Sequence, residues 1–554
     1  MQTANDRAVV RLPLLDQYIA EQGRLTAVER FAQLHEAGEA GVRRYRDLLP
    51  SQRPTAGKQY GFEVDLDQCT GCKACVTACH RLNGLDQAEG ETWRSVGSLQ
   101  GRGSGAALQP VTTACHHCVD PACLQGCPVN AYEKDPTTGI VRHLDDQCIG
   151  CQYCTLTCPY EVPQFNRRLG IVRKCDMCAD RLEAGEAPAC VDACPNEAIA
   201  IRLVDQAELR EAARGPSALP GAPSPALTVP ATRYISAKPI AEMMAADHHH
   251  AREGAEHTPL VVMLVLTQAS VGAFAVEFLL RHAPAWAWPA QSRALHMVTA
   301  VAVGLLALLA STLHLGRPLQ ALRALIGLRR SWLSREILLF ALFAVSSIVY
   351  AALSLCPAGS PTIAALVAAL AGTVAGLGVT AVLCSVMVYR ATRRRLWSGP
   401  RTAVRFFATT LLLGMASALA SAAASSRPGL SAFAPGARSL ATALATLGMA
   451  KLLWELGILL HLADRQRTDL KRTALLLTGR LRPIFAYRIA LGVAFGVIGP
   501  LLSAQAWSAA EVDRASVVVS GVVVLCGLTL AEMLERSLFF RAVSAPRMPG
   551  NWGS

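Results

Sequence analysis

Sixteen of the chain's 19 cysteines lie between Cys69 and Cys194, in four groups of four. The first and third groups share the spacing C-x2-C-x2-C-x3-C, the second reads C-x2-C-x4-C-x3-C, and the fourth has eleven residues between its second and third cysteines. The groups are Cys69, Cys72, Cys75 and Cys79; Cys115, Cys118, Cys123 and Cys127; Cys148, Cys151, Cys154 and Cys158; and Cys175, Cys178, Cys190 and Cys194. Proline follows the last cysteine of groups two, three and four. Cysteines at such spacings bind metals or form disulfide bonds.

Iron–sulfur clusters explain this spacing better than zinc or disulfides. In the bacterial ferredoxin run, three closely spaced thiolates hold one [4Fe–4S] cluster and the fourth reaches the neighbouring cluster. That run occurs twice over here, which predicts four [4Fe–4S] clusters. A zinc site needs four ligands, usually from two C-x2-C pairs, so a further cysteine in each group is surplus. A disulfide framework suits a small secreted domain, and this sequence does not open with a cleavable signal peptide.

A second pair of candidate residues, His314 and Glu336, lies at the edges of two long apolar stretches. A quinol gives up protons and electrons, so its site needs a proton acceptor and a hydrogen-bond partner beside an electron acceptor. A histidine and a carboxylate at the membrane edge can supply the first two. The alternative is that both are helix-end side chains satisfied at the lipid headgroups.

Other polar residues interrupt the apolar stretches. Lys451 and Glu455 are four residues apart and are expected to form an ion pair. His296 and His461 could ligate a haem if their helices faced each other, but packed or interfacial histidines are expected instead, and no haem is predicted. The remaining residues of this kind are Glu277 and Arg488, while Cys356, Cys384 and Cys526 are interpreted as buried apolar residues.

Charge and hydropathy divide the chain in two. Residues 1–257 carry 26 Lys+Arg against 32 Asp+Glu, whereas residues 258–554 carry 27 against 9. The basic half is also very apolar, so its arginines are expected to flank membrane spans rather than contact nucleic acid. Eight apolar stretches are each long enough to cross a bilayer. They lie near 259–280, 294–313, 336–355, 362–389, 403–424, 440–463, 485–505 and 515–534.

The loops between these stretches predict the orientation. Loops after spans two, four and six hold five or six Lys or Arg residues each, and the loops after odd-numbered spans hold at most two. Basic loops stay in the cytoplasm. We therefore expect a multi-pass protein of the cytoplasmic membrane, with both termini and the cysteine-rich domain on the cytoplasmic side.

These patterns predict an α+β ferredoxin-like double domain, built of two pseudo-repeated modules for two [4Fe–4S] clusters each, followed by an all-α eight-helix transmembrane bundle. Residues 214–231 are rich in Pro, Ala, Gly and Ser, which is typical of a semi-extended linker. The glycines around Gly97–Gly105 are interpreted as a surface loop, and His248–His250 as a solvated run. The predicted parts are a helical arm (1–59), which docks on a partner or on its own domain, the four-cluster domain (60–203), a linker (204–257), the membrane anchor (258–540) and a tail (541–554).

The cysteine array resembles the four-cluster electron-transfer subunit of the complex iron–sulfur molybdoenzymes, in the dimethyl sulfoxide reductase branch. The membrane half resembles the anchor subunit of that branch, so two normally separate subunits are fused here. The motifs that carry the resemblance are Ala114-Cys115-His116-His117-Cys118, Cys148-Ile149-Gly150-Cys151-Gln152-Tyr153-Cys154, Arg173-Lys174-Cys175-Asp176-Met177-Cys178, His314-Leu315-Gly316-Arg317-Pro318 and Ser334-Arg335-Glu336.

The resemblance implies that the cysteine groups exchange ligands, one with four and two with three. A cysteine stands at Cys151, where the nitrate reductase branch has tryptophan and a three-iron cluster, so four cubanes are implied. The implied ligand sets are Cys69, Cys72, Cys75 and Cys194; Cys175, Cys178, Cys190 and Cys79; Cys115, Cys118, Cys123 and Cys158; and Cys148, Cys151, Cys154 and Cys127. The resemblance also assigns the quinol site to His314 and Glu336 and implies a molybdopterin-containing catalytic subunit as a separate polypeptide.

The predicted function is therefore a membrane-bound electron-transfer subunit. It would oxidise quinol, specifically menaquinol, from the membrane pool and pass electrons through four clusters to a catalytic subunit that reduces an S- or N-oxide. One alternative runs the same conduit in reverse, from a partner dehydrogenase to quinone. Another is a scaffold or ion-translocating module without quinone-dependent electron flux. The sequence does not suggest an intramembrane chain of carboxylates for the latter.

Overall fold

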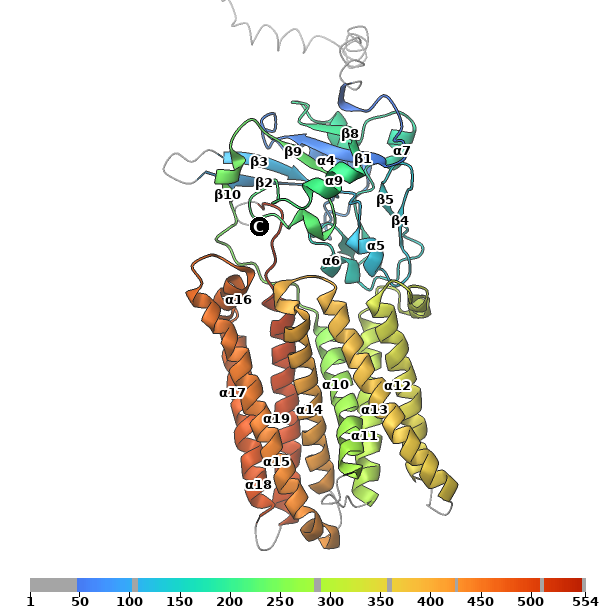
Figure 1. Ribbon diagram of the computed structural model, residues 1–554, viewed down its shortest axis with the longest axis vertical. Helices are drawn as coiled ribbons and strands as arrows, with labels where there is room; N and C mark the ends of the chain where they lie inside the picture. The colour runs from blue at the N-terminus through green and yellow to red at the C-terminus, as the bar shows by residue number, and fades with distance from the viewer. Residues whose placement is uncertain are drawn as a thin grey trace, which may run out of the picture.

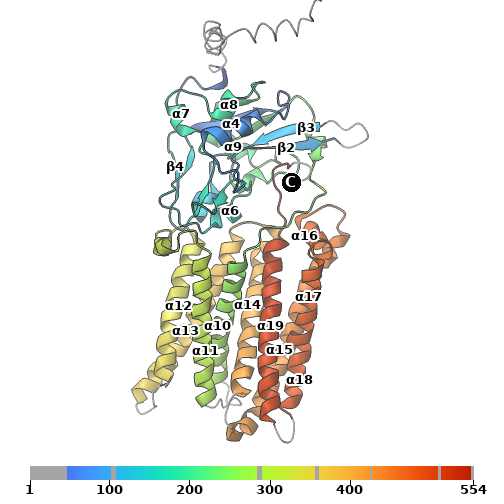
Figure 2. The ribbon, with the colours of Figure 1, turned by 180° about the vertical axis from the view of Figure 1, so that it is seen from behind.

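The computed structural model describes residues 47–101, 108–282, 290–355, 361–423, 427–508 and 513–550. A small α+β domain lies on one end of a bundle of long helices (Figure 1). The same two layers are seen from behind in Figure 2. This confirms the predicted fold class. Of the N-terminal arm predicted for residues 1–59, the structure describes only residues 47–59.

The cysteine-rich domain is held together by its first and last strands. Strand β1 pairs antiparallel with β8, and Phe62, Val64 and Ile201 from these strands are buried. Two short hairpins, β4–β5 and β6–β7, lie between them in the sequence. The elements of this domain are β1 (Lys58–Asp65), α4 (Ala74–Leu82), β2 (Ser95–Gln100), β3 (Leu108–Thr113), α5 (Ala122–Gly126), β4 (Tyr132–Lys134), β5 (Val141–His143), α6 (Tyr153–Thr157), β6 (Gln164–Asn166), β7 (Ile171–Arg173), α7 (Ala179–Glu183), α8 (Ala189–Asp192) and β8 (Ile199–Asp205).

The first C-x2-C loops of the four cysteine groups share one backbone feature. The residue before the second cysteine of each loop is left-handed: Gly71 (φ 73°), His117 (φ 40°), Gly150 (φ 68°) and Met177 (φ 63°). A left-handed residue turns the chain sharply, so the flanking cysteines can face the same side. The repeated conformation is the structural counterpart of the repeated spacing.

The prediction of a linker at 204–257 is wrong. Strand β8 continues to Asp205, and three further elements pack onto the cysteine-rich domain: α9 (Gln206–Ala212), β9 (Arg233–Ile235) and β10 (Met244–Ala245). Strand β9 runs parallel to β1, and β10 pairs with β2. Leu219 and Ala231 are buried, and the Ala231 N–H donates to the carbonyl of His116 at 3.0 Å. The Pro-rich composition prevents long helices but does not prevent apolar side chains from docking in a core.

The prediction of a surface loop is also wrong at Gly97. Gly97 lies in strand β2, which pairs with β3, and residues 102–107 fall outside the described part. A Cβ on Gly97 would lie 1.7 Å from the carbonyl oxygen of Pro549. Glycine is needed here because the C-terminal tail passes against the strand.

The membrane half confirms the predicted spans. Eight helices in the described residues are long and apolar enough to cross a membrane. Some extend further than predicted, and α19 continues seven residues past 534, because charged residues near the helix ends are paired inside the bundle. The spans are formed by α10 (Thr258–Arg281), α11 (Ala290–Leu313), α12 (Trp332–Leu355), α13 (Pro361–Arg390), α14 (Gly399–Ala423), α15 (Arg427–Leu456), α17 (Arg482–Val493) with α18 (Gly499–Ala506), and α19 (Arg514–Arg541). A short π-helix, η6 (Ala494–Ile498), joins α17 to α18, and the short helix α16 (Asp469–Thr478) lies outside the spans.

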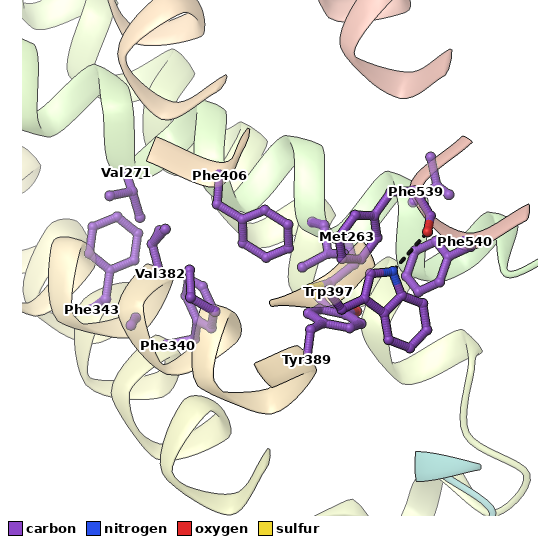
Figure 3. Close-up of a cluster of buried hydrophobic side chains, with 14 of the residues drawn as sticks. Met263, Val271, Phe340, Phe343, Val382, Tyr389, Trp397, Phe406, Phe539 and Phe540 are labelled. Carbon is purple, nitrogen blue, oxygen red and sulfur yellow. Dashed lines mark hydrogen bonds between the residues drawn. The ribbon is translucent and has the colours of Figure 1, made fainter. Parts of the chain in front are cut away.

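Short segments occupy the end of the bundle that faces the cysteine-rich domain. They are the 3-10 helices η3 (Pro318–Leu325), η4 (Arg395–Trp397) and η5 (Gly457–Ala463). An aromatic cluster closes this end (Figure 3), in which the Trp397 ring stacks on Phe539 and its Nε1 donates to the Phe539 carbonyl at 2.9 Å. Tyr389, Phe406 and Phe540 pack around them. The cluster joins α13, α14 and α19 beneath the cysteine-rich domain.

Candidate functional site

The structure brings cysteines of groups one and four together. Cys69 interacts electrostatically with Cys72 and Cys194. Cys79 interacts instead with Cys178 and Cys190. The last cysteine of each group therefore lies beside the other group, in the arrangement that the resemblance implies.

Groups two and three show the same exchange. The neighbours of Cys158 include Cys115, Cys118 and Cys123. Those of Cys127 are the first three cysteines of group three, Cys148, Cys151 and Cys154. These neighbours match the exchange of ligands that the resemblance implies, although Cys175 also lies near Cys115 and Cys75 near Cys190.

These thiols fit [4Fe–4S] clusters chemically. Burial raises the pKa of Cys79 and Cys151 to about 12, so these side chains need a positively charged partner to act as thiolates. Backbone N–H groups point at sulfur, with Ala131 N–H 3.2 Å from Cys127 Sγ and Ala198 N–H 3.3 Å from Cys194 Sγ. Hydrogen bonds to sulfur tune the potential of such clusters.

No disulfide joins the cysteines of the described residues. In the same part of the chain, no three His, Cys, Asp or Glu side chains are close enough to hold one metal ion. A four-iron cube spreads its ligands more widely than a single zinc ion does. Cys384 is buried as predicted, Cys526 is exposed against the prediction, and Cys356 lies outside the described residues.

Two buried cations lie among the cysteines, and no role was predicted for them from the sequence. Arg94 is buried beside Cys75, Cys175 and Cys190. Lys174 is buried beside Cys115, and its Nζ donates to the carbonyl oxygens of Cys175 (2.8 Å) and Val141. A buried cation is stable only when it is paired, and thiolate-ligated clusters are anionic. The signal in the sequence was Lys174 immediately before Cys175, although spacing alone does not show burial.

The third cysteine group rests directly on the membrane half. The Arg317 N–H donates to the Ile149 carbonyl at 3.0 Å, and the Gly327 N–H donates to the Pro128 carbonyl at 2.8 Å. A Cβ on Gly316 would lie 2.1 Å from the Gly170 carbonyl oxygen. Glycine at this position therefore permits the close approach of the two halves.

His314 lies at this junction. Its side chain hydrogen-bonds with the backbone of Cys151, and its Nε2 is a buried atom without a hydrogen-bond partner. Burial, and then the neighbouring His257, lower the pKa of His314 to about 4. The rings of His257 and His314 are 6.0 Å apart.

Glu336 lies at the same end of the bundle. It is 4% exposed, and the Ser385 hydroxyl donates to its Oε1. Burial, and then the charge of Glu336, raise the pKa of Tyr153, which lies within the third cysteine group. The residue after Glu336, Ile337, packs against the apolar cluster that contains Cys148 and Cys154. No hydrogen bond or ion pair joins Glu336 to His314 among the described residues, so a molecule between them would have to bridge the two.

A cavity of about 480 Å³ lies beside this site, between the two halves of the protein. His257, Arg394, Glu161 and Asp247 contribute to its wall, together with Gln152, which follows Cys151. His257 was expected in a linker, so its place at the site was not predicted. Its contact with His314 arises because residues 245–257 pack under the cysteine-rich domain.

The other polar residues singled out in the membrane half contact different groups. His296 lies early in α11, with Nε2 3.0 Å from the Ala273 carbonyl, whereas His461 lies in η5, with Nδ1 3.1 Å from Asp464. The two histidines therefore do not form a facing pair. The predicted ion pair of Lys451 and Glu455 is confirmed at 3.5 Å.

Comparisons with known proteins match both halves. Residues 251–541 match the family described as the DMSO reductase anchor subunit, and residues 107–203 match a 4Fe-4S dicluster domain. The first half is similar to the B subunit of the anaerobic dimethyl sulfoxide reductase of Haemophilus influenzae, at 36% identity over 27% of this chain and 76% of that protein.

Two further relatives match the same region. The thiosulfate reductase electron transfer subunit PhsB of Salmonella typhi is 38% identical over 27% of this chain and 80% of its own length. The hydrogenase-2 operon protein HybA of Escherichia coli O157:H7 is 37% identical over 26% of this chain, and the match spans only 52% of that protein.

Proposed function

The protein belongs to the family of DMSO reductase anchor subunits and carries a fused iron–sulfur domain, and on this basis we propose that it oxidises quinol in the membrane and delivers the electrons to a separate molybdopterin-containing subunit. Menaquinol is the proposed donor, and an S- or N-oxide or a related oxyanion is the proposed class of terminal acceptor. The relatives named for dimethyl sulfoxide and thiosulfate reductases support this assignment.

The observation that carries the proposal is the position of His314 and Glu336. Both lie at the end of the bundle that carries the third cysteine group, and both contact or face residues of that group. A quinol head group between them would lie close to the Cys148–Cys154 loop. Proton and electron acceptors would then be adjacent, as quinol oxidation requires.

The sixteen cysteines are the proposed cluster ligands, in the four sets that the resemblance implies. The clusters supply one-electron transfer when they are bound. His314 accepts a hydrogen bond from a quinol hydroxyl at Nε2, since this atom has no partner within the described part of the protein. Glu336 accepts from the second hydroxyl, and the Ser385 hydroxyl, which donates to Oε1, holds its carboxylate in place.

The proton leaves towards the cysteine-rich domain. His257 lies between His314 and the 480 Å³ cavity, whose polar lining includes Glu161 and Asp247. This face of the bundle also carries the arginine-rich loops. We therefore place both termini, the iron–sulfur domain and the site of proton release on the cytoplasmic side of the cytoplasmic membrane.

A specific observation keeps the reverse direction open as a second candidate. HybA, one of the relatives, is named for a hydrogenase operon, so electrons could enter from a partner and leave as quinol through the same residues. Midpoint potentials of the bound clusters, measured against that of menaquinone, separate the two directions. Cluster potentials mostly above that of menaquinone favour quinol oxidation, and cluster potentials mostly below it favour quinone reduction.

The test of the quinol site uses the full-length protein in proteoliposomes. In the variants His314→Gln and Glu336→Gln, we expect cluster reduction by a menaquinol analogue, followed by stopped-flow absorbance, to fall by about a hundredfold, the range for loss of an acid–base group. Reduction by dithionite and an iron content of about sixteen per protein molecule should be unchanged. His282→Gln, at the opposite end of the bundle, is the control. Quinol oxidation that survives both substitutions contradicts the assignment.

A further inference from the structure

Charged side chains gather inside the second half of the bundle, away from the quinol site. Arg488 of α17 donates to Glu455 of α15 at 3.0 Å and to Glu532 of α19 at 3.1 Å. Lys451 is paired with both carboxylates. Each of these four side chains is at most 6% exposed.

The cluster continues along α14 and α19. Arg405 lies 3.4 Å from Glu535, and Arg536 donates to Gln268 of α10 at 3.0 Å. This set of carboxylates was not predicted from the sequence, because Glu532 and Glu535 belong to one helix turn at the end of the last span. Their partners on other helices lie between 44 and 130 residues earlier in the sequence.

The cluster has more positive than negative charge. Its cations are Arg405, Lys451, Arg488 and Arg536, and its carboxylates are Glu455, Glu532 and Glu535. Arg401, one helix turn before Arg405, adds another cation, and no hydrogen bond or ion pair to its side chain is found within the described residues. Uncompensated charge is costly near a membrane interior, which favours a bound anion beside the cluster.

A cavity of about 470 Å³ opens where this excess lies. Arg401, Arg405 and His461 line it, together with Trp454 and the first residues of α14. The carboxylate of Glu455 also lines it but is engaged by Arg488 and Lys451. The Arg405 side chain, which is 9% exposed, also lines this cavity, and its Nε lies 3.4 Å from Glu535. The N-terminus of α14 adds a favourable field for an anion.

Apolar side chains lead from this cavity along the bundle surface. Val404 and Leu411 are exposed on α14, and Leu453 and Met449 are exposed on α15. Because α14 begins and α15 ends beside the cysteine-rich domain, both pairs run from the cavity towards the middle of the bundle (Figure 1). These exposed apolar side chains can contact acyl chains attached to a head group in the cavity.

We propose that this cavity binds the phosphate of an anionic phospholipid from the leaflet beside the cysteine-rich domain. The Arg401 guanidinium pairs with the phosphate, Arg405 and the N-terminus of α14 supply the surrounding positive field, and Trp454 lies at the boundary between head group and acyl chain. The bound lipid neutralises the excess charge of the buried cluster.

The test compares lipid retention in the full-length protein. After washing in mild detergent, phospholipid phosphorus per protein molecule is measured and the lipids are identified by mass spectrometry. The wild type should retain phosphatidylglycerol or cardiolipin. Arg401→Gln should bind it about fivefold more weakly, the factor expected for losing one cation near an anionic surface. Arg401→Lys should resemble the wild type, and so should Arg480→Gln, which removes an exposed arginine from the same end of the bundle outside the cavity.

A second measurement identifies the source of the phosphate. In nanodiscs, the wild type should unfold at a higher temperature when phosphatidylglycerol is added to phosphatidylcholine, and Arg401→Gln should lose most of this shift. Retention of the wild-type lipid complement by Arg401→Gln overturns the proposal. So does stabilisation of delipidated protein by inorganic phosphate to the same extent as by phosphatidylglycerol. Neither readout involves quinol oxidation, so the result is independent of the proposed function.

Discussion

At the scale of single residues, the molecule depends on charges that are buried only because each has a partner. Arg94 and Lys174 lie among the cysteines, and Glu336 lies at the junction beside Ser385. A buried charge without its partner is strongly destabilised. Substitutions at these positions should therefore alter redox behaviour or stability.

Arg94 is expected to raise the reduction potentials of the clusters around it. Its positive charge favours the state with the extra electron, so Arg94→Gln should lower the potential of at least one cluster by about 60 mV, a tenfold change for a one-electron couple. EPR-monitored redox titration measures this shift. Arg94→Lys keeps the charge and should have potentials close to those of the wild type. Wild-type potentials in Arg94→Gln would contradict the electrostatic role.

His257 is expected to carry protons between His314 and the junction cavity. His257→Leu removes the imidazole beside His314 and should slow quinol-driven cluster reduction by up to about a hundredfold, with dithionite reduction unchanged. His250→Leu is the matched control, because His250 lines the same cavity. If both variants behave alike, the relay through His257 is wrong.

At the scale of elements, short loops rather than long helices position the site. The C-x2-C loops share left-handed residues, and the loop between α11 and η3 docks through Gly316 against Gly150 and Gly170. Backbone-to-backbone contact at this distance leaves no room for a side chain. Glycine thus sets the separation of the proposed quinol site from the third cysteine group.

Gly316→Ala tests this contact directly. Its Cβ would lie 2.1 Å from the Gly170 carbonyl oxygen, so the cysteine-rich domain must move away. We expect slower quinol-driven cluster reduction with unchanged iron content and helix content by circular dichroism. Gly376→Ala in α13 is the control, because nothing lies within 4 Å of its added Cβ. An unchanged rate would show that the loop can adjust.

At the scale of the whole molecule, the two halves are held together by the chain segments that precede and follow the membrane bundle. Residues 204–257 pack on the cysteine-rich domain before entering α10, and the tail after α19 returns to strand β2. The Ser98 N–H donates to the Gly550 carbonyl at 3.3 Å, and Arg547 pairs with Asp247 at 2.6 Å. The noncovalent contacts of the C-terminal tail thus add to the covalent link between the two halves.

Truncation after Arg541 should weaken this attachment. Without the tail, β2 loses a neighbour and Asp247 loses its ion pair, so the cysteine-rich domain should unfold at a lower temperature while the bundle is little affected. Limited proteolysis should cleave the 245–257 segment faster than in the wild type. Arg547→Gln should show a smaller effect of the same sign, and unchanged proteolysis in both variants would show that the tail does not contribute.

The sequence by itself determined the features that depend on local spacing. Cysteine spacing predicted iron–sulfur ligation, apolar length predicted eight spans, and arginine-rich loops marked one end of the bundle. Each is a property of neighbouring residues, so no knowledge of tertiary contacts was needed. His314 and Glu336 were likewise proposed as site residues from their places at span ends.

Only the tertiary structure decided which distant residues meet. The 204–257 segment is part of a domain because its apolar side chains pack in a core with those of β1, β2 and β3. His257 met His314 for the same reason, and Arg405 met Glu535 across 130 residues of sequence. Such pairings depend on how helices dock, and docking is decided by the sum of many weak contacts that no short stretch of sequence contains.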